Sequence, residues 1–416
     1  MSRAVSVALV GIGGYGNTYL RELFPAHAEH RLQFVAGIDP APRDCRHLQA
    51  FADARIPIYA SLDEFYARLT ADLIIITAPI HWHAPLTCLA LEHGSHVLCE
   101  KPVAAAIQDA CAMAAAAEAA QRFVAIGYQW SFSDAVQALK QDVLAGALGR
   151  PARLKTHVFW PRSLSYFARS DWAGKLKTAD GAWVLDSIAN NATAHYLHNM
   201  FYVLGDSRET SAWPVDVQAE LYRANAIENY DAAAIRCHTG DDVEILFYAA
   251  HCVATHRDPT VHYEFEQAVV EFTEAPERTL TARFHDGRVK HYGDPNATLY
   301  NKLRQLVDAI HDSRESRAAM PVACGVETAM PHIVCINGAQ ESMPDIGTIP
   351  ANLIRQDERQ DDTVIWVEGL QEQFEACYDQ HLLPSEMPDI DWARPGTPVN
   401  LRNYRVFPSK SPEYRG

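Results

Sequence analysis

Residues 5–16 read VSVALVGIGGYG, an apolar run followed by a cluster of glycines. The run predicts a strand buried on both faces, and the glycines fit the pattern G-x-G-x-x-G at the start of a helix. In this pattern Gly11 permits a tight turn, Gly13 lets the backbone approach a pyrophosphate, and Gly16 allows close packing of helix on strand. The free N–H groups of a helix N-terminus attract an anion. The segment therefore predicts a dinucleotide site that uses the whole loop: Gly11, Ile12, Gly13, Gly14, Tyr15 and Gly16.

Short apolar runs and helical stretches alternate through the rest of the first 127 residues. The expected strands are residues 5–10, 34–38, 73–76, 96–99 and 123–126, and the expected helices include residues 84–93 and 104–121. Alternation of this kind is typical of a doubly wound parallel sheet. We therefore expect residues 1–127 to form an α/β Rossmann domain that binds NAD or NADP.

An acidic residue, Asp39, follows the second expected strand just over 20 residues after the glycine loop. An acid at this place accepts hydrogen bonds from the adenine ribose and repels a 2′-phosphate, which favours NAD over NADP. The alternative is that Asp39 merely initiates a turn before Pro40. Arg43 lies close enough in sequence to leave room for NADP.

The pattern changes after residue 128. Residues 153–159, 217–223, 232–237, 243–248, 263–272 and 279–284 mix apolar and polar β-formers, and Gly240-Asp241 and Asp286-Gly287 are typical hairpin turns. We expect residues 128–384 to form an α+β domain with a large open, mostly antiparallel sheet and one free face, crossed by helices near residues 182–204 and 300–313. Residues 385–416 are expected to form an extended tail over the surface or onto a neighbouring subunit.

Composition restricts the partners. A net charge of −16 argues against nucleic acid, and the absence of a long apolar run argues against a membrane span. The nine cysteines are irregularly spaced, so we expect reduced thiols in a cytoplasmic protein and no metal site.

Three further motifs carry a family resemblance. They are Thr77-Ala78-Pro79-Ile80-His81-Trp82-His83, then His96-Val97-Leu98-Cys99-Glu100-Lys101-Pro102, and then the stretch from Gly181 to Gly205. With the glycine loop they resemble the glucose–fructose oxidoreductase / inositol dehydrogenase (Gfo/Idh/MocA) family. The resemblance implies a Rossmann domain followed by an open-sheet domain through which members form dimers or tetramers.

The resemblance also implies site residues. Lys101 is expected beside the nicotinamide and the substrate, with Glu100 and Pro102 setting the backbone and the bond before Pro102 in the cis form. His83 either lines the nicotinamide side or caps the following helix. The remaining positions assigned to the cofactor site are Thr77, Pro79 and Gln129.

The third motif departs from the family pattern. The family places an Asp four residues before the catalytic His, but four residues before His195 stands Asn191. Asp186 stands nine residues before His195, as though about five residues were inserted between them. Either Asp186 reaches the site through a bulged connection or Asn191 occupies the Asp position. His198 and Asn199 are explained equally well as core residues.

These residues suit the oxidation of a secondary alcohol. His195 is the expected general acid–base, Asp186 would raise its basicity, and Lys101 would stabilise the developing alkoxide. Aromatic and basic residues between positions 128 and 183 suit a sugar ring, although most of the aromatics could be core. The residues assigned to the substrate are Lys101, Tyr128, Arg162, Trp172, Asp186, Asn191 and His195.

The sequence thus predicts an NAD-dependent oxidoreductase that acts on a CH–OH group of a sugar, cyclitol or related polyol. The altered spacing before His195 leaves open an NAD-dependent glycosidase, which oxidises its sugar transiently and eliminates the aglycone. A cofactor-bound sensor is disfavoured by the presence of both Lys101 and His195.

Overall fold

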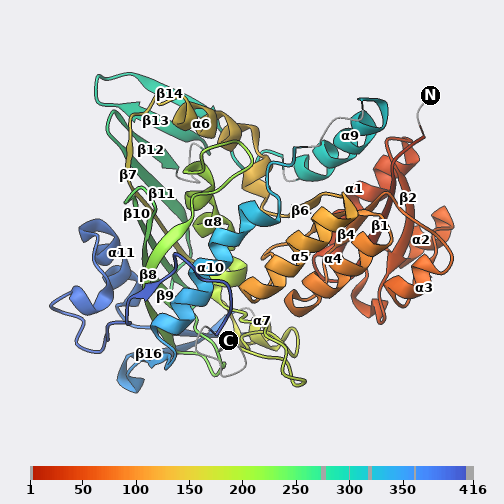
Figure 1. Ribbon diagram of the computed structural model, residues 1–416. Helices are drawn as coiled ribbons and strands as arrows, with labels where there is room; N and C mark the ends of the chain where they lie inside the picture. The colour runs from red at the N-terminus through yellow and green to blue at the C-terminus, as the bar shows by residue number, and fades with distance from the viewer. Residues whose placement is uncertain (1–2, 273–277, 299, 317–320, 360–361, 409–416) are drawn as a thin grey trace. The chain divides into compact units, whose positions relative to one another are not determined.

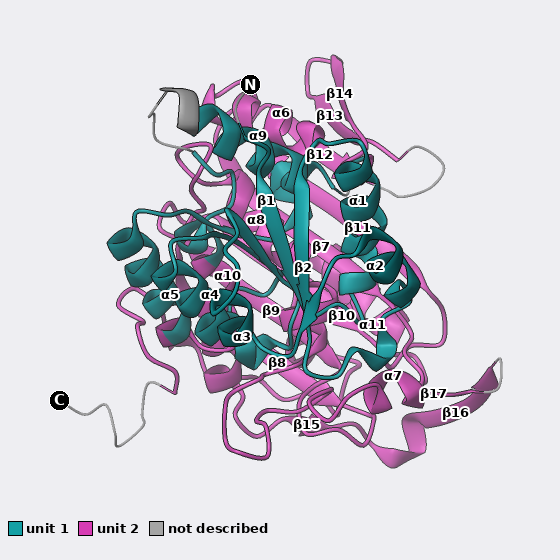
Figure 2. Ribbon diagram, turned by 90° about the vertical axis from the view of Figure 1, so that its right-hand side faces the viewer, with its two compact units in different colours: residues 1–104, 109–132, 298–329 teal, residues 105–108, 133–297, 330–416 magenta. Residues whose placement is uncertain are grey.

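The computed structural model describes residues 3–272, 278–298, 300–316, 321–359 and 362–408. Contacts divide the chain into two compact units, which Figure 2 shows in different colours. Unit 1 comprises residues 1–104, 109–132 and 298–329, and unit 2 comprises residues 105–108, 133–297 and 330–416. Each unit is described by itself.

Unit 1 contains a six-stranded sheet in the order β3-β2-β1-β4-β5-β6, and all the neighbouring strands are parallel. Its strands are β1 (Ser6–Val10), β2 (Gln33–Ile38), β3 (Ile58–Tyr59), β4 (Leu73–Ile76), β5 (His96–Cys99) and β6 (Val124–Ile126). β1, β4 and β5 are buried at every position, as expected for strands covered on both faces. The strand order reverses between β1 and β4, and ligands bind at such a switch point in open α/β sheets. The predicted doubly wound parallel sheet is confirmed.

The helices of unit 1 connect these strands in the expected way. They are α1 (Gly16–Ala28), α2 (Leu48–Ala54), α3 (Leu62–Tyr66), α4 (His83–Glu92) and α5 (Ile107–Ala120), with short 3₁₀ turns at Pro42–Asp44, Ile80–Trp82 and Gln129–Phe132. α5 contains eight alanines in 14 residues, and alanine has the highest helix propensity.

A late segment of the chain also belongs to unit 1. Helix α9 (Asn301–Ser316) follows unit 2 in sequence, yet residues 298–329 pack with the Rossmann strands. Tyr300 donates a hydrogen bond to the carbonyl of Thr18 at 3.2 Å, and Asn301 donates to the carbonyl of Phe132 at 2.9 Å. The division expected at residues 127 and 128 therefore omits a segment that the Rossmann unit recruits from far along the chain.

Unit 2 contains a ten-stranded sheet. Nine strands follow the order β14-β13-β12-β11-β7-β10-β9-β8-β15, and β18 pairs with β8. The pairs β7–β10 and β8–β15 are parallel and the others antiparallel, so the mostly antiparallel sheet is confirmed. The strands are β7 (Pro151–Phe159), β8 (Pro214–Arg223), β9 (Ala232–Thr239), β10 (Glu244–Ala250), β11 (Arg257–Phe265), β12 (Ala268–Phe272), β13 (Leu280–Phe284), β14 (Val289–Gly293), β15 (Gly347–Thr348) and β18 (Val399–Asn400). The single strand expected over residues 263–272 is instead the end of β11, a turn and β12.

Helices lie on both faces of this sheet, so the expectation of one free face is wrong for its centre. Figure 1 shows α8 (Ala194–Val203) and α10 (Val326–Ser342) on one side and α11 (Leu370–Gln380) on the other. In β10 every residue from Ile245 to Ala250 is buried, and Tyr248 donates to the carbonyl of Leu382 just after α11. α6 (Asp134–Leu144), α7 (Leu164–Ala168) and a separate hairpin of β16 (Ile354–Arg359) and β17 (Asp362–Val367) complete the unit.

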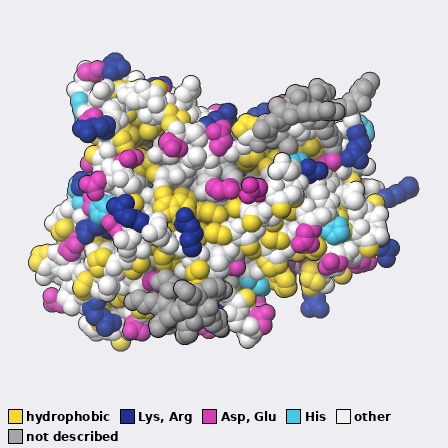
Figure 3. All heavy atoms as spheres, viewed as in Figure 1, with side chains coloured by type: hydrophobic (Ala, Val, Ile, Leu, Met, Phe, Trp, Pro, Cys, Tyr) yellow, Lys and Arg dark blue, Asp and Glu magenta, His cyan; other side chains and the backbone are white. Residues whose placement is uncertain are grey.

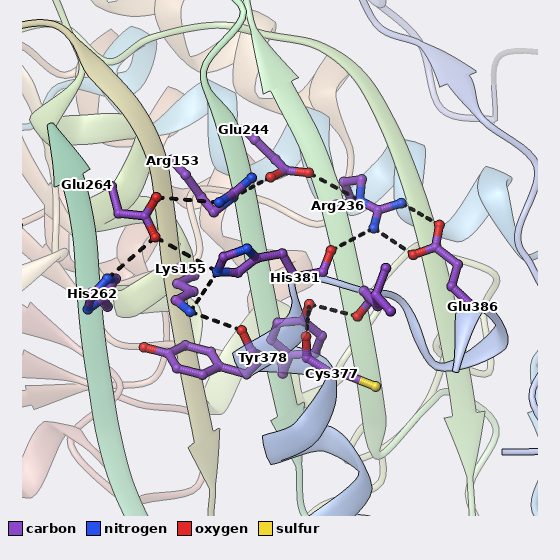
Figure 4. A network of polar contacts seen from close by, with 12 residues as sticks. Arg153, Lys155, Arg236, Glu244, His262, Glu264, Cys377, Tyr378, His381 and Glu386 are labelled. Carbon is purple, nitrogen blue, oxygen red and sulfur yellow. Dashed lines mark hydrogen bonds and ion pairs between the residues drawn. The ribbon is translucent and has the colours of Figure 1, made fainter. Parts of the chain in front are cut away.

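The α11 face of the sheet carries a chain of alternating charges (Figure 4). Arg153 pairs with Glu244 and with Glu264 at 3.4 Å, and Arg236 pairs with Glu386 at 2.7 Å. Lys155 donates to the carbonyl of Tyr378 at 3.0 Å. These contacts fix the segment that contains α11 onto the strands.

The described part of the expected tail packs on its own chain. Val399 and Asn400 pair with β8, and Trp392 meets Tyr222 edge to face with ring centroids 4.8 Å apart. Residues 409–416 lie outside the described residues. All nine cysteines are free thiols in the structure.

Charge is mixed on the face shown in Figure 3, where the described Lys and Arg side chains are scattered among acidic ones. Within the described ranges, no helix is both long and apolar enough to cross a bilayer. The same residues contain no group of three or more His, Cys, Asp and Glu side chains placed to hold a metal ion.

Candidate functional site

The glycine loop connects β1 to α1 in unit 1. A Cβ atom on Gly16 would lie 1.9 Å from the carbonyl oxygen of Gly11, so only glycine fits where helix and strand meet. Thr77, at the end of β4, donates to the carbonyls of Val10 and Gly11 and fixes the turn from the side. Gly14 has a positive φ of 44° and open space around its Cβ position. The loop therefore presents bare backbone at the switch point of the sheet.

A cavity of about 380 Å³ adjoins this loop and is lined by Gly14, Asn17, Arg43, Asp44, Cys45 and Arg46. Asp39 lies beside the loop, where its carboxylate accepts hydrogen bonds from the N–H groups of Ile12 at 3.1 Å and Ala41 at 2.9 Å. These backbone contacts hold the carboxylate at the end of β2, next to the glycines. The bare loop, the acid and the cavity fit the pyrophosphate and ribose of a dinucleotide.

The end of β5 carries Glu100, Lys101 and Pro102, and the peptide bond between Lys101 and Pro102 is cis, as predicted. Glu100 is buried, with only 6% of its surface exposed. Its carboxylate accepts from the Tyr19 hydroxyl at 2.6 Å, from the Lys302 ammonium and from the backbone N–H of Lys101 at 3.2 Å. We call Tyr19, Glu100 and Lys302 the Glu100 cluster.

Burial alone would raise the pKa of Glu100. The Lys302 ammonium, together with the hydrogen bonds from Lys302 and Tyr19, outweighs burial and holds the pKa below its usual value. A Cβ atom on Gly127 would lie 2.6 Å from the Glu100 carboxylate, so this glycine makes room for the buried group. The cluster ties the backbone of Lys101 to α1 and α9.

The structure does not give His83 a helix-capping role, and its place on the nicotinamide side stays a prediction. His83 is the first residue of α4, whose N-cap Trp82 makes no side-chain capping bond. Its ring is buried, with Nδ1 2.8 Å from the carbonyl oxygen of Pro102 and Nε2 2.9 Å from that of Ala78. Burial lowers the pKa of His83. The ring thus connects the loops that follow β4 and β5.

The other predicted residues of unit 1 differ in exposure. Tyr15 is 47% exposed at the glycine loop, and Pro79 and Gln129 are half-buried in the loops after β4 and β6. Tyr128, assigned to the substrate, is a fully buried core side chain with 0% exposure.

In unit 2 the insertion before His195 forms a π-helical turn, η4 (Ile188–Ala192), directly before α8. Such turns commonly absorb inserted residues and are frequent at functional sites. The turn brings Asn191 to Asp186, with Nδ2 donating to Oδ1 at 2.7 Å. The two candidates for the family's Asp position are therefore hydrogen-bonded to each other.

Asp186 is buried, with 3% exposure, and accepts two further bonds on Oδ2. The backbone N–H of Gly174 donates at 2.7 Å and Arg169 at 3.3 Å. His195 is the second residue of α8 and is half-buried, whereas His198 and Asn199 are fully buried further along the same helix. Burial lowers the pKa of His198 well below its usual value, which agrees with the core alternative for these two residues.

Aromatic rings and arginines surround Asp186. The Arg169 guanidinium lies 3.9 Å from the Tyr166 ring centroid and 5.1 Å from that of Trp172. Arg162 lies 5.0 Å from the Tyr166 centroid and 5.5 Å from that of Trp160. We call this group the Arg162 cluster: Trp160, Arg162, Tyr166, Arg169, Trp172 and Asp186. A cavity of about 570 Å³ lies beside it, with Phe167, Gly174 and Asn225 in its wall.

Residues 5–128 match the model of the "Oxidoreductase family, NAD-binding Rossmann fold". The chain is 28% identical over 141 residues to 1-carboxy-3-chloro-3,4-dihydroxycyclohexa-1,5-diene dehydrogenase from Comamonas testosteroni, which covers 34% of this chain and 35% of the relative. It is also 28% identical over 345 residues to inositol 2-dehydrogenase from Burkholderia multivorans, covering 77% of this chain and 96% of the relative.

Solved structures share the fold. The WlbA dehydrogenase from Bordetella pertussis, in complex with NADH and UDP-GlcNAcA, matches with a TM-score of 0.66 at 18% identity, covering 82% of this chain and 97% of that one. An oxidoreductase from Agrobacterium radiobacter in complex with NAD⁺, L-tartaric acid and magnesium matches with a TM-score of 0.64 at 16% identity, with coverages of 82% and 97%.

The glycine loop and the parallel sheet place unit 1 among the NAD-binding Rossmann-fold oxidoreductases. Residues 5–128 thus match the model of the Gfo/Idh/MocA oxidoreductases, as the motifs predicted, and the similarity to the inositol 2-dehydrogenase extends over most of that relative's length.

The roles of three residues near the site were missed from the sequence. Lys302 stands 202 positions from Glu100 and looks like an ordinary charged residue of an amphipathic helix. Arg169 was noticed only as one basic residue among aromatics, and its ion pair with Asp186 needs the turn at residues 174–186. His251, whose ring approaches Tyr166 and Phe167, gave no sequence signal.

Proposed function

We propose that the protein is an NAD-dependent dehydrogenase that transfers a hydride between the nicotinamide and a secondary alcohol of a sugar, cyclitol or related polyol. The observation that carries this proposal is the place of Lys101. It follows β5 on the same sheet edge as the glycine loop, and its N–H is bonded to the buried Glu100 carboxylate. Such a defined position suits a cation that acts at the reacting oxygen.

The residues would divide the reaction between them. NAD, when bound, accepts the hydride. The Lys101 ammonium would orient the hydroxyl and stabilise negative charge on its oxygen. His195 would take the hydroxyl proton. Asp186, held by Asn191, Gly174 and Arg169, would position the substrate and favour protonation of His195.

Asp39 would select NAD over NADP. Its backbone partners hold the carboxylate next to the glycine loop, where it can accept ribose hydroxyls and repel a phosphate. Calorimetric titration with NAD⁺ and NADP⁺ tests this assignment, and Asp39→Ala should narrow the difference in affinity. Equal or tighter binding of NADP⁺ to the unmodified protein would contradict it.

The activity can be tested by incubating the protein with NAD⁺ and a panel of monosaccharides, cyclitols, sugar acids and aryl glycosides while following NADH absorbance. Lys101→Ala and His195→Ala should each lower turnover by about 10²–10⁴-fold while changing cofactor affinity little. Lys290→Ala, at an exposed lysine that pairs with Asp142, is the matched control. Aglycone release without accumulation of NADH would support the glycosidase alternative instead.

We also propose that the protein is cytoplasmic and forms a dimer or tetramer through the large sheet. The nine free thiols support a reducing compartment. Because α11 covers the centre of one sheet face, the strands from β11 to β14 are the part best suited to association. Light scattering coupled to gel filtration measures the mass, and a monomer would contradict the proposal.

A further inference from the structure

The Arg162 cluster contains more positive than negative charge. Arg162 and Arg169 contribute two guanidiniums, and Asp186 contributes one carboxylate, which pairs with Arg169. Arg162 forms no ion pair with a described carboxylate. Its recorded polar contacts are a 3.4 Å bond to the carbonyl of Pro161 and an interaction with the Tyr166 hydroxyl.

Arg162 is held firmly despite this imbalance. Its guanidinium lies against the rings of Trp160 and Tyr166, and its backbone N–H donates to the carbonyl of His251 at 3.2 Å. Its Nε atom is buried and has no hydrogen-bond partner. A buried donor left without an acceptor is destabilising, so this arrangement is unfavourable until an acceptor binds.

The neighbouring polar groups do not accept a hydrogen bond from this Nε atom. The Asp186 carboxylate is already engaged by Gly174, Arg169 and Asn191. The His251 ring bonds through Nδ1 to the carbonyl of Trp160 at 2.8 Å, and Tyr166 is covered by both arginines. A guanidinium presents a planar fork of donors that matches a carboxylate.

The cluster belongs to the candidate substrate region. Its aromatic wall continues from Trp160 to Tyr196, whose rings meet edge to face at 5.9 Å, and Tyr196 follows His195 in α8. Asp186, a candidate site residue, is part of the cluster itself. A group bound by Arg162 would therefore sit beside the residues assigned to the reaction.

We propose that Arg162 binds a carboxylate group of the substrate, so that the substrate is a sugar acid or another polyol that carries a carboxylate. This inference rests on the proposed function, because it names the substrate class of that site. Arg162 is thus a specificity-determining residue. The carboxylate that it binds and the hydroxyl that is oxidised are on different carbons of the substrate.

Matched pairs of sugars test the proposal. With NAD⁺, D-glucuronate and D-galacturonate should have kcat/KM values at least about ten-fold above those of D-glucose and D-galactose, because a charge-assisted hydrogen bond contributes roughly 1.5–3 kcal/mol. Arg162→Gln should lower kcat/KM for the uronates by about 10–100-fold, chiefly through KM, and change the values for the neutral sugars by less than about three-fold. Arg162→Lys should fall in between.

Arg288→Gln is the matched control, since Arg288 also stacks on an aromatic ring, Phe284, but already pairs with Asp286. It should leave both classes of sugar unchanged. Arg162→Gln should change the melting temperature little, because removal of the buried Nε donor that has no partner offsets the loss of the contacts with Trp160 and Tyr166. A neutral sugar preferred by the unmodified protein, or an equal loss for uronates and neutral sugars in Arg162→Gln, would overturn the proposal.

Calorimetry separates this inference from the proposed function. D-glucuronate should bind to the NADH-loaded protein and should bind at least about ten-fold more weakly to Arg162→Gln. Such binding without hydride transfer would refute the proposed function and leave the carboxylate site standing. Hydride transfer on neutral sugars without uronate binding would overturn the site and leave the function. Binding of D-glucose 6-phosphate but of neither uronate would also overturn the carboxylate assignment.

Discussion

The Glu100 cluster of unit 1 and the Arg162 cluster of unit 2 both remove charges from water, but they balance them differently. In the Glu100 cluster one carboxylate meets one ammonium, and both side chains are at most 8% exposed. The Arg162 cluster contains two guanidiniums but one carboxylate, which pairs with Arg169, whose side chain is 28% exposed. A closed, neutral cluster is suited to holding backbone in place, whereas a partly open cluster with spare positive charge is suited to binding an anion.

The largest expected effect comes from breaking the closed cluster. Lys302→Met leaves the Glu100 carboxylate buried without its cation, which should lower the free energy of unfolding by about 3–5 kcal/mol. Chemical denaturation at neutral pH measures the loss. Adding Glu100→Gln to Lys302→Met should restore part of it, because the remaining group is then neutral. A loss below about 1 kcal/mol for Lys302→Met would mean that the cluster is not structural.

The next largest effect is on the pH dependence of stability, to which the two clusters should contribute over different pH ranges. Burial, and then the charge of Arg162 and Arg169, lower the pKa of His251 to about 3. The unfolded chain binds a proton at this residue below about pH 6.5 and the folded chain does not, so stability falls as the pH decreases from about 6.5 to about 3. The slope is at most about 1.4 kcal/mol per pH unit from this one group.

His251→Gln should remove the contribution of this histidine to the pH dependence of the free energy of unfolding. Denaturation midpoints measured at intervals between pH 7 and pH 4 provide the test, and His285→Gln, at an exposed histidine, should leave the slope unchanged. The Glu100 cluster responds to acid in the same direction but at lower pH. The lowered pKa of Glu100 means that the stability from this group is present above the unfolded pKa and is lost only as pH falls through the lower folded pKa. If the pH dependence of stability were unchanged in His251→Gln, then the Arg162 cluster would not lower the pKa of this histidine.

A smaller effect is expected for the ion pair within the open cluster. A double-mutant cycle with Arg169→Met and Asp186→Asn should give a coupling energy of about 1–2 kcal/mol, since Asp186 keeps its bonds from Gly174 and Asn191 when Arg169 is removed. Asp186→Asn should also lower turnover, whereas Lys302→Met should affect stability more than KM. Additivity of the two substitutions would contradict the pairing of Arg169 with Asp186.

The sequence predicted the Rossmann unit well because its signals are local. The apolar runs of β4 and β5 were located to the residue, and the glycine loop depends only on its own spacing. The Glu100 cluster could not be predicted, because its ammonium lies 202 positions from its carboxylate. The wrong expectation of one free face on the large sheet could have been avoided from the sequence. Leu370, Phe374, Cys377 and Tyr378 form a buried stripe at helical spacing, which signals the helix α11 that covers the sheet.

The smallest expected effect concerns the charges on the α11 face of the sheet (Figure 4). Arg236 binds Glu386 through two nitrogens, each 2.7 Å from a carboxylate oxygen, and also donates to the carbonyl of His381 at 3.0 Å. The Glu386 side chain is 35% exposed, so water and salt screen the pair far more than they screen Lys302 and Glu100. A cycle with Arg236→Met and Glu386→Gln should therefore give a coupling energy of only about 0.5–1 kcal/mol, decreasing as salt is added. A coupling above about 3 kcal/mol that resists salt would mean that this network is as closed as the Glu100 cluster. In that case the degree of exposure would no longer explain why the Glu100 cluster holds structure while the Arg162 cluster is free to bind a ligand.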